Sequence, residues 1–339
     1  MLFVWIGFIL FVLLLLALDL GVFHRKAHVV SVKEALAWSA IWIALALAFS
    51  LVVYFGYENH WLGLGNAPDA VDGQINHGRQ AVLKYLTGYV VEKSLSVDNI
   101  FVIAMLFSFF AVPAKYQHRV LFWGILGALV MRGAMIGAGA ALIARFHWIL
   151  YIFGGLLIVT AIKMLTMDTG HSDPGKNIVV RWMRKLFPVT DEFHDEHFIV
   201  RNDVGRLALT PLALSLVMVE TTDLIFAVDS IPAIFAITAD PFLVFTSNVF
   251  AILGLRSLYF ALAGAIEKFR YLKVSLAAVL ALVGVKMLAA NWIKDLLGEH
   301  FNFYLLGAVL GILAIGVFAS MIANRRVRRN RELATSHPD

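Results

Sequence analysis

Cysteine is missing from all 339 residues of the chain. Without thiols, the chain cannot form a disulfide, a Cys-x-x-Cys redox pair, a Cys-ligated zinc site or an iron–sulfur cluster. Ligation of a soft metal would have to rest on methionine and histidine alone. The absence removes thiol chemistry from the functions open to this sequence.

Charged residues are also scarce. They make up 15% of the chain, against about 25% in ordinary soluble domains. Hydrophobic residues make up 60%, and the mean hydropathy is +0.81. A soluble core of this size cannot hide that much apolar surface. The composition excludes a cytosolic enzyme, a secreted disulfide scaffold and a disordered regulator, and it predicts an all-α polytopic membrane protein.

Motifs for ATP hydrolysis and for intramembrane proteolysis are lacking as well. Gly133, Gly137 and Gly139 lie in mid-span without the Lys-Ser/Thr pair of a nucleotide loop. An aspartyl protease is disfavoured because Val97 and Val228, rather than a Gly-x-Gly element, precede two membrane aspartates. We therefore expect no enzyme activity, no catalytic residues and no permanently bound cofactor.

Long apolar runs dominate what is present. A spanning helix needs about 20 mostly apolar residues. The first run has no basic segment before it, so we interpret it as a retained anchor rather than a signal peptide. The nine predicted spans are 2–23, 35–56, 85–110, 120–143, 148–167, 207–237, 243–266, 272–290 and 303–323.

Basic residues predict the orientation of these spans. With the N-terminus outside, 18 of the 28 Lys and Arg fall in cytoplasmic loops and the C-terminal tail, as the positive-inside rule favours. We therefore expect a multi-pass protein of the inner (plasma) membrane, with its N-terminus outside and its C-terminus in the cytoplasm. The basic tail fits contact with anionic membrane lipid better than a nucleic-acid site.

Two stretches of the chain resemble each other. They share, in the same order, an acid six residues before the Asp of a Val-Asp pair, an Ile-Leu-Gly element, an arginine and a Lys-Met-Leu element. The paired landmarks are Glu92 with Asp223, Asp98 with Asp229, Gly127 with Gly254, Arg132 with Arg256, and Lys163 with Lys286. Each stretch holds three spans, so the second copy is predicted to be inverted, as in many secondary transporters with a midplane site between the repeats.

This repeat defines the predicted domain organisation. A two-span region with an outer loop comes first, and a cytoplasmic loop connects the two three-helix repeats. The ninth span and the basic tail follow. The corresponding ranges are 1–84, 85–167 (first repeat), 168–206 (connecting loop), 207–290 (second repeat) and 291–339.

Six carboxylates fall inside the predicted spans. A charge at the bilayer centre costs about 2.5–3.5 kcal/mol on insertion scales, so each acid needs a partner, a water-filled cavity or a proton. Five acids in two repeat-related spans outnumber the deep arginines, which leaves negative charge for a cation or protons to balance. The predicted metal ligands are Glu92, Asp98, Glu220, Asp223 and Asp229, with Asp19, Asn99, Ser230, Asn248, Arg132 and Arg256 as supporting residues.

Several of these roles stay open at this point. Arg132 and Arg256 either neutralise carboxylates in the empty state or hold the repeats together. Asp19 lies near the inner end of its span, as a boundary residue or as an entry-path ligand. Lys163 and Lys286 lie near helix ends, where we expect their side chains to snorkel to the interface.

Helix geometry limits how the acids can converge. Residues six apart are turned by about 240° on an ideal helix, so straight helices cannot aim all five acids at one ion. Either the sites are sequential or the helices are broken, and Pro232 predicts a break that frees the Val228 carbonyl beside Asp229. Oxygen ligands without cysteine suit hard or borderline divalent cations such as Mn²⁺, Mg²⁺ or Ca²⁺.

A second polar cluster lies in the connecting loop. Residues 191–197 read Asp-Glu-Phe-His-Asp-Glu-His, with two histidines among four acids. Such a cluster could capture a metal before transport, but it lacks the His-Glu-x-x-His spacing. We favour ordinary solvated charges.

The segments around the membrane acids resemble a known family. Residues 92–101, Glu-Lys-Ser-Leu-Ser-Val-Asp-Asn-Ile-Phe, and residues 220–235 are similar to the two signature segments of the TerC family, in particular its Alx-like branch. The similarity covers the chain from the end of the first span through the eighth. It implies an inner-membrane protein linked to Mn²⁺ export and tellurium resistance, in which the five acids named as metal ligands line the cation path.

Together, these observations predict a secondary transporter that exports divalent cations, with Mn²⁺ as its substrate, in exchange for protons. The preference for Mn²⁺ rests on the resemblance. The alternative is a membrane scaffold that supports metallation of extracytoplasmic proteins or an envelope stress response through a protein partner. The outer loop 57–80, with His60, Asp69, Asp72 and His77, is the sizeable outer surface for such a partner.

Overall fold

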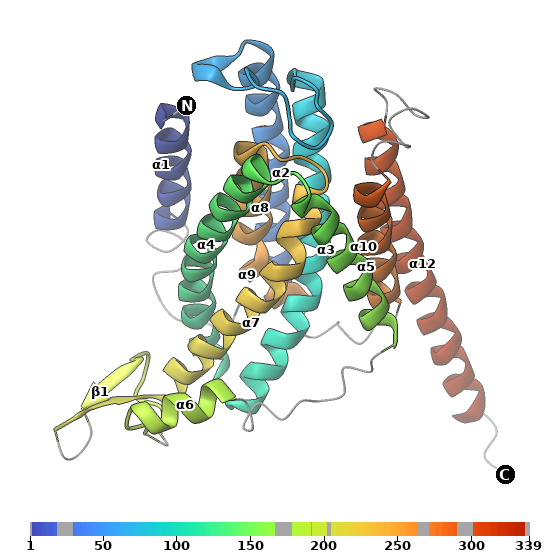
Figure 1. Cartoon of the computed structure of the whole chain (residues 1–339). Helices are drawn as coiled ribbons and strands as arrows, with labels where there is room; N and C mark the ends of the chain where they lie inside the picture. Colours follow the sequence, from blue (N-terminus) through green and yellow to red (C-terminus); the bar gives the residue numbers. More distant parts are fainter. Residues whose placement is uncertain are drawn as a thin grey trace.

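The computed structural model describes residues 2–18, 30–166, 178–190, 192–201, 205–262, 271–289 and 301–335. They form a bundle of long α-helices with a small helix-and-hairpin unit at one end (Figure 1). The helices of the bundle are α1 (Leu2–Leu18), α2 (Val32–Glu58), α3 (Gly78–Phe109), α4 (Ala114–Arg145), α5 (Ile149–Thr166), α7 (Pro211–Phe235), α8 (Pro241–Leu253), α9 (Leu255–Leu262), α10 (Leu272–Leu288) and α12 (Phe301–Thr335).

The short elements lie at the two ends of the bundle. One end carries α6 (Ile178–Leu186) and the antiparallel strands β1 (Ile199–Arg201) and β2 (Leu207–Leu209), and we name it the hairpin end. The other carries residues 59–77, with the single turn η2 (Trp61–Gly63), and we name it the loop end.

Six helical segments of the described residues are long and apolar enough to cross a membrane. They are α2, α4, α5, α7, the α8–α9 pair and α12. Helix α3 is long enough, with 32 residues, but carries several charges, and α1 and α10 have 17 residues each. The polytopic α-helical membrane class is confirmed, and the count of nine spans stays a prediction.

Helix boundaries follow capping residues rather than the ends of apolar runs. Helix α7 begins at Pro211, because the side chain of Thr210 caps it and residues 207–209 form a strand instead of the predicted start of a span. Asp240 caps α8 in the same way, followed again by a proline. Helix α3 begins at Gly78, so the end of the predicted outer loop is helical.

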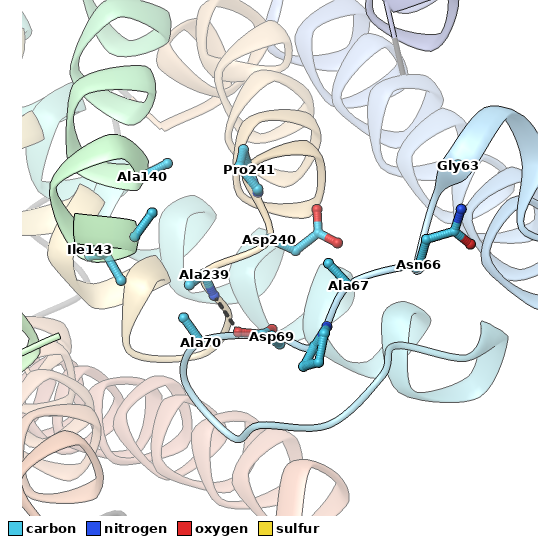
Figure 2. A pocket seen from close by; sticks show the side chains of 13 residues that line it. Gly63, Asn66, Ala67, Asp69, Ala70, Ala140, Ile143, Ala239, Asp240 and Pro241 are labelled. Carbon is cyan, nitrogen blue, oxygen red and sulfur yellow. Dashed lines mark hydrogen bonds between the residues drawn. The ribbon is translucent and has the colours of Figure 1, made fainter. Parts of the chain in front are cut away.

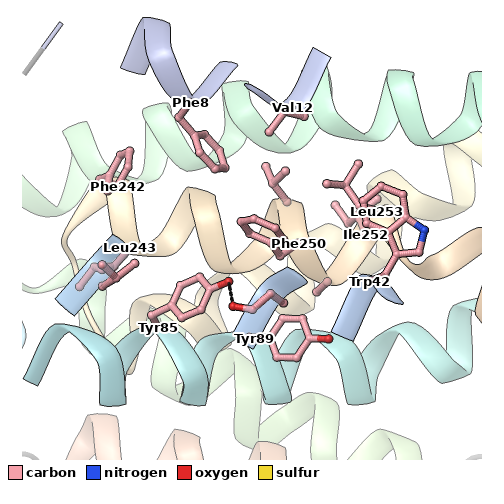
Figure 3. Close-up of a cluster of buried hydrophobic side chains, with 14 of the residues drawn as sticks. Phe8, Val12, Trp42, Tyr85, Tyr89, Phe242, Leu243, Phe250, Ile252 and Leu253 are labelled. Carbon is pink, nitrogen blue, oxygen red and sulfur yellow. Dashed lines mark hydrogen bonds between the residues drawn. The ribbon is translucent and has the colours of Figure 1, made fainter. Parts of the chain in front are cut away.

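Helix α8 is the buried centre of the bundle. Aromatic side chains from α1, α2 and α3 cover it, with Phe8 and Tyr85 around Phe250 and Trp42 beside Ile252 and Leu253 (Figure 3). The Tyr85 hydroxyl donates to the carbonyl oxygen of Ala46 at 3.1 Å, so the polar end of this ring is satisfied inside the apolar core. Helices α1 and α12 lie at opposite edges of the bundle (Figure 1).

Four helix pairs make the most extensive contacts between the segments predicted as repeats. Helix α5 packs against α10 over the largest contact, and α3 packs with α8, α4 with α7, and α3 with α7. Helices α5 and α10 approach closely at two glycines. A Cβ on Gly284 would lie 3.0 Å from the carbonyl oxygen of Gly154, so neither position has room for a side chain without a shift of the backbone.

One span is broken, at Gly254 between α8 and α9. A helix leaves its last four carbonyls without intrahelical partners, and Lys93 of α3 donates to one of them, the carbonyl oxygen of Ala251, at 3.1 Å. The break predicted at Pro232 is wrong, because α7 continues through that proline to Phe235. A proline so near the helix end removes only one backbone hydrogen bond.

Candidate functional site

Arg132 lies at the centre of the charged interior. It is 1% exposed, and its Nη1 donates to Glu92 of α3. Its Nε and Nη2 donate to the two carboxylate oxygens of Asp223 of α7, at 3.1 and 2.9 Å. Nη1 also donates to the Oγ of Ser230 at 3.3 Å. One side chain of α4 therefore ties α3 to α7 through bidentate and single charge-assisted hydrogen bonds.

Carboxylates outnumber cationic side chains around Arg132. Glu220 lies one helical turn before Asp223, and its carboxylate lies against the α4 backbone at Gly127, where a Cβ would overlap it. Glu92 is fully buried, and Oε2 of both glutamates is buried without a hydrogen-bond partner in the described part of the chain. We name Glu92, Arg132, Glu220, Asp223 and Ser230 the Arg132 cluster. Its three carboxylates, if all ionised, and its one guanidinium give a net charge of −2.

A small cavity adjoins the cluster. Its volume is about 20 Å³, room for about one water molecule. Asp223 and Arg256 line it together with apolar side chains of α3, α4, α7 and α8. The second landmark arginine, 3% exposed, therefore faces the same cavity from α9.

Other predicted ligands lie outside the cluster. Asp229 is half-buried and accepts a hydrogen bond from the Thr160 hydroxyl of α5 at 3.0 Å. This separation from Asp223 follows from the six-residue spacing on one helix. Asn99 and Asn248 are buried in α3 and α8.

The side chains of two predicted metal-site residues fall outside the described part of the chain. Asp19 and the side chain of Asp98 lie outside the described residues. Within the described ranges, no three His, Asp or Glu side chains are grouped to hold a metal ion. Arg132 lies where a cation between Glu92 and Asp223 would lie, and the five-acid ligand set stays a prediction.

Lys286 corrects one expectation. Its side chain is 6% exposed and donates to the carbonyl oxygen of Ala236, just past the end of α7, instead of snorkelling to the interface. The carbonyl oxygens at the end of a helix lack intrahelical hydrogen-bond partners and therefore favour such a donor. Lys163, its predicted counterpart, is exposed.

The histidines of the connecting loop bond to backbone. His194 and His197 each place Nδ1 about 3 Å from a carbonyl oxygen, of Glu192 and His194 respectively. Glu196 forms a 2.5 Å ion pair with Arg119 at the start of α4. Asp191 lies outside the described residues. The described part of the loop fits solvated and structural charges better than metal capture.

At the loop end, Asp69 fastens residues 59–77 onto the bundle. Its carboxylate, fully buried, pairs with Lys84 of α3 at 2.8 Å. It also accepts hydrogen bonds from the Thr238 hydroxyl and from the backbone N–H of Ala239, the latter at 2.9 Å. Lys84 is shared with Asp72 at 2.8 Å. The outer loop is thus bound to both α3 and the α7–α8 connection.

A cavity of about 520 Å³ opens beside this network. Asp69, Asp240, Ala140 and Ile143 are among its lining residues (Figure 2). Burial raises the pKa of Asp240, and its hydrogen bond from Tyr57 opposes this rise. Burial acts in the same direction on Asp69, but Lys84 outweighs it and lowers the pKa of that carboxyl.

An apolar layer separates this cavity from the Arg132 cluster. Phe235 is fully buried at its centre, packed with Ile136, Ile234 and Val244. A Cβ on Gly139 would lie 2.6 Å from the Phe235 ring. Gly139 lies one residue before the cavity wall and two helical turns from the arginine, so the aromatic ring lies between the cavity and the charges.

Comparison with known proteins supplies a family. Residues 77–329 match the model of the integral membrane protein TerC family. An uncharacterized membrane protein of Myxococcus xanthus is 49% identical over 321 residues, 95% of this chain and 92% of that protein. A protein of Escherichia coli strain K12, with the provisional name membrane-bound redox modulator Alx, is 45% identical over 328 residues, 96% of this chain and 97% of that protein.

A further relative carries the same provisional name. The protein from Photorhabdus laumondii is 44% identical over 322 residues, 95% of each chain. No solved structure matches this chain.

Proposed function

The chain belongs to the TerC family of integral membrane proteins, and from that premise we propose that it is a secondary transporter that exports divalent cations, Mn²⁺ above all, through the Arg132 cluster. The orientation that we propose places the hairpin end in the cytoplasm of the cell and the loop end outside, as the distribution of basic residues favours.

The charge of the cluster is the observation that carries the proposal. Three carboxylates, when all are ionised, and one arginine have a net charge of −2, which one divalent cation would cancel. When the cation leaves, protons must replace it, because a net charge of this size inside an apolar bundle is costly. Exchange of one divalent cation for up to two protons follows from this balance.

Arg132 would act as the internal counter-ion of the empty transporter. It holds Glu92 and Asp223, while the unpartnered Oε2 atoms of Glu92 and Glu220 remain as acceptors for an arriving ion. Carboxylate oxygens suit Mn²⁺, Mg²⁺ and Ca²⁺. The choice of Mn²⁺ among them rests on the family resemblance.

The packing supports the proposed inverted repeat. A two-fold axis that exchanges α3 with α7 and α4 with α8 would turn the α3–α8 contact into the α7–α4 contact, and both contacts are extensive. It would also exchange Gly127 with Gly254, and each of these glycines meets a charged side chain of the opposite half, Glu220 and Lys93.

The apolar layer around Phe235 would be the outer barrier of the path. A cation leaving the cluster towards the loop-end cavity has to pass this layer, which offers no ligand and excludes water. Movement of α7 relative to α4 at Phe235 and Gly139 would open it.

Transport in vesicles tests the proposal. We expect saturable, proton-coupled Mn²⁺ uptake into inside-out vesicles, lost in Asp223→Asn and Glu220→Gln. The loss reflects ligands that would line the path, and competition by Ca²⁺, Mg²⁺ and Zn²⁺ measures selectivity. The matched control is Asp195→Asn, an exposed acid outside the bundle core. Uptake no higher than in empty vesicles, with folded protein present, would contradict transport.

The scaffold alternative predicts function without uptake. Its candidate surface, the outer loop, is held by Asp69 to Lys84 and Ala239, so a deletion of this loop would damage the bundle itself. Exposed positions such as His60 and His77 are better probes: their substitution should impair a scaffold and leave uptake intact. A redox role by thiol exchange is closed to this cysteine-free chain.

A further inference from the structure

Helix α6 has two chemically opposite sides. Trp182, Met183 and Leu186 fall on one arc of the helix, and Arg181, Arg184 and Lys185 fall on the other. Trp182 and Leu186 are 65% and 62% exposed, and Phe187, directly after the helix, is 49% exposed. A large apolar surface therefore lies uncovered by the described residues, beside three basic side chains.

The height of α6 along the bundle is fixed by Val180. This side chain is 3% exposed and packs in one cluster with Tyr116 and Leu212. Tyr116 is the third residue of α4 and Leu212 the second of α7, so α6 lies at the level where two spans begin. Figure 1 shows α6 across the hairpin end, beside the start of α7. A bilayer around these spans places its headgroup layer at this height.

We propose that α6 is an interfacial helix that docks on anionic phospholipid, with Trp182 and Leu186 at the acyl boundary and the three basic side chains at lipid phosphates. Tryptophan favours this depth of a membrane. Basic residues beside an apolar arc bind anionic lipid surfaces, with a gain in partitioning of about fivefold for each residue at low salt. A second copy of this chain would fit less well, because three like charges would face three like charges. The proposal requires a membrane and is independent of the transported ion.

Single labels on the cysteine-free full-length chain test this docking. Trp182→Cys carries a nitrobenzoxadiazole fluorophore in one sample, and His194→Cys, an exposed position of the same connecting loop, carries it in the other. Both are reconstituted in phosphatidylcholine vesicles with and without phosphatidylglycerol, with acyl chains brominated or not. We expect about twofold quenching by brominated lipid at 182, greater with phosphatidylglycerol, and little at 194.

Neutral variants of α6 distinguish the contribution of its basic residues to lipid binding from that of its apolar arc. The triple change Arg181→Gln, Arg184→Gln and Lys185→Gln should abolish the added quenching from phosphatidylglycerol, because the attraction to lipid phosphates is lost. Arg145→Gln, an exposed basic residue of α4 at the loop end, should leave it unchanged.

Two results would overturn the proposal. Quenching at 182 as weak as that expected at 194 would mean that α6 does not reach the bilayer. Protection of the label at 182 from both brominated lipid and aqueous iodide would mean that protein, such as a second copy, covers this face.

Discussion

In the two segments predicted as repeats, α3–α5 and α7–α10, which we name the two halves, matching glycines meet opposite charges. In the first half, Gly127 receives the carboxylate of Glu220 on an unbroken α4. In the second half, Gly254 receives the ammonium of Lys93, where the span breaks into α8 and α9. Similar sequence landmarks therefore position different chemistry. The continuous helix α4 carries Arg132, which pairs with acids of both halves, whereas at the broken span a lysine of the first half satisfies a helix end.

Arg132, which links the two halves, should make the largest single contribution to the stability of the folded protein. Arg132→Gln would leave Glu92 and Asp223 without their cation, and breaking such a buried pair typically costs about 3–5 kcal/mol. We expect a strongly lowered Tm in detergent, or failure to accumulate.

Two control variants make this prediction specific. Arg145→Gln, an exposed arginine on the same helix, should change the free energy of unfolding by less than about 0.5 kcal/mol. Adding Glu92→Gln and Asp223→Asn to Arg132→Gln should recover much of the stability, because no unpaired charge remains. An unchanged Tm in Arg132→Gln alone would show that the halves are held together elsewhere.

Two matched threonines compare burial in the two regions. Thr238→Val removes a hydrogen bond to the fully buried Asp69 and should cost about 1–3 kcal/mol. Thr160→Val removes one from the half-buried Asp229, which water can partly replace, and should cost less than about 1 kcal/mol. The difference in Tm between the two variants measures this effect, and equal values would contradict the role of burial.

The paired glycines should separate stability from transport. At Gly127 an alanine Cβ meets only the flexible end of Glu220, so we expect a Tm close to wild type but much reduced Mn²⁺ uptake. At Gly254 an alanine Cβ would lie 2.6 Å from Lys93 Nζ and 3.2 Å from Cβ of the buried Trp42. We therefore expect a lower Tm, with a loss of about 1 kcal/mol in the free energy of unfolding. Equal uptake in Gly127→Ala and wild type would remove Glu220 from the path.

The smallest expected effect is a pH dependence at the loop end. Lys84 lowers the folded pKa of Asp69 below its ordinary value, so the contribution of this carboxylate is complete above that value and is lost as the pH falls through the folded pKa. The wild-type Tm should therefore decline as the pH falls below about 4, the ordinary pKa of an aspartate.

Asp69→Asn should flatten this decline in a series of Tm measurements between pH 3 and 6. Asp240 has the opposite sign: burial raises its pKa, so its contribution is present at low pH and is lost as the pH rises through the folded pKa. An identical acid profile in Asp69→Asn and wild type would assign the decline to other groups.

The sequence predicts the helical membrane class and part of the charged interior. Acids in apolar helices are costly wherever they point, so Glu92 and Asp223 stand out without a structure, and Arg132 follows from the internal repeat. Their mutual contact depends on three helices and could not be read from spacing.

Other features had no signal along the chain. Gly127 accommodates Glu220 through packing between distant helices. Lys84 precedes the predicted span 85–110, and no pattern marks it as buried, because its burial depends on Asp69 and on the residues that hold Asp69, more than 150 positions away. The break was expected at Pro232, the residue with the strongest local effect, whereas it occurs at Gly254, where a lysine from another helix compensates for it.

Helix α10 links this protein to the thickness of its bilayer. Its 17 residues, bounded on both sides by described non-helical residues, span about 25 Å, less than the roughly 30 Å of an average hydrocarbon core. It also makes the most extensive helix contact of the described bundle, with α5, which it approaches at Gly154 and Gly284, and it exposes Val274 and Val285. We predict that α10 is a span, and lipid next to this pair would then thin by several ångströms, at a cost of a fraction of a kcal/mol per ångström. Longer acyl chains would therefore strain the α5–α10 contact, which joins the two predicted repeats.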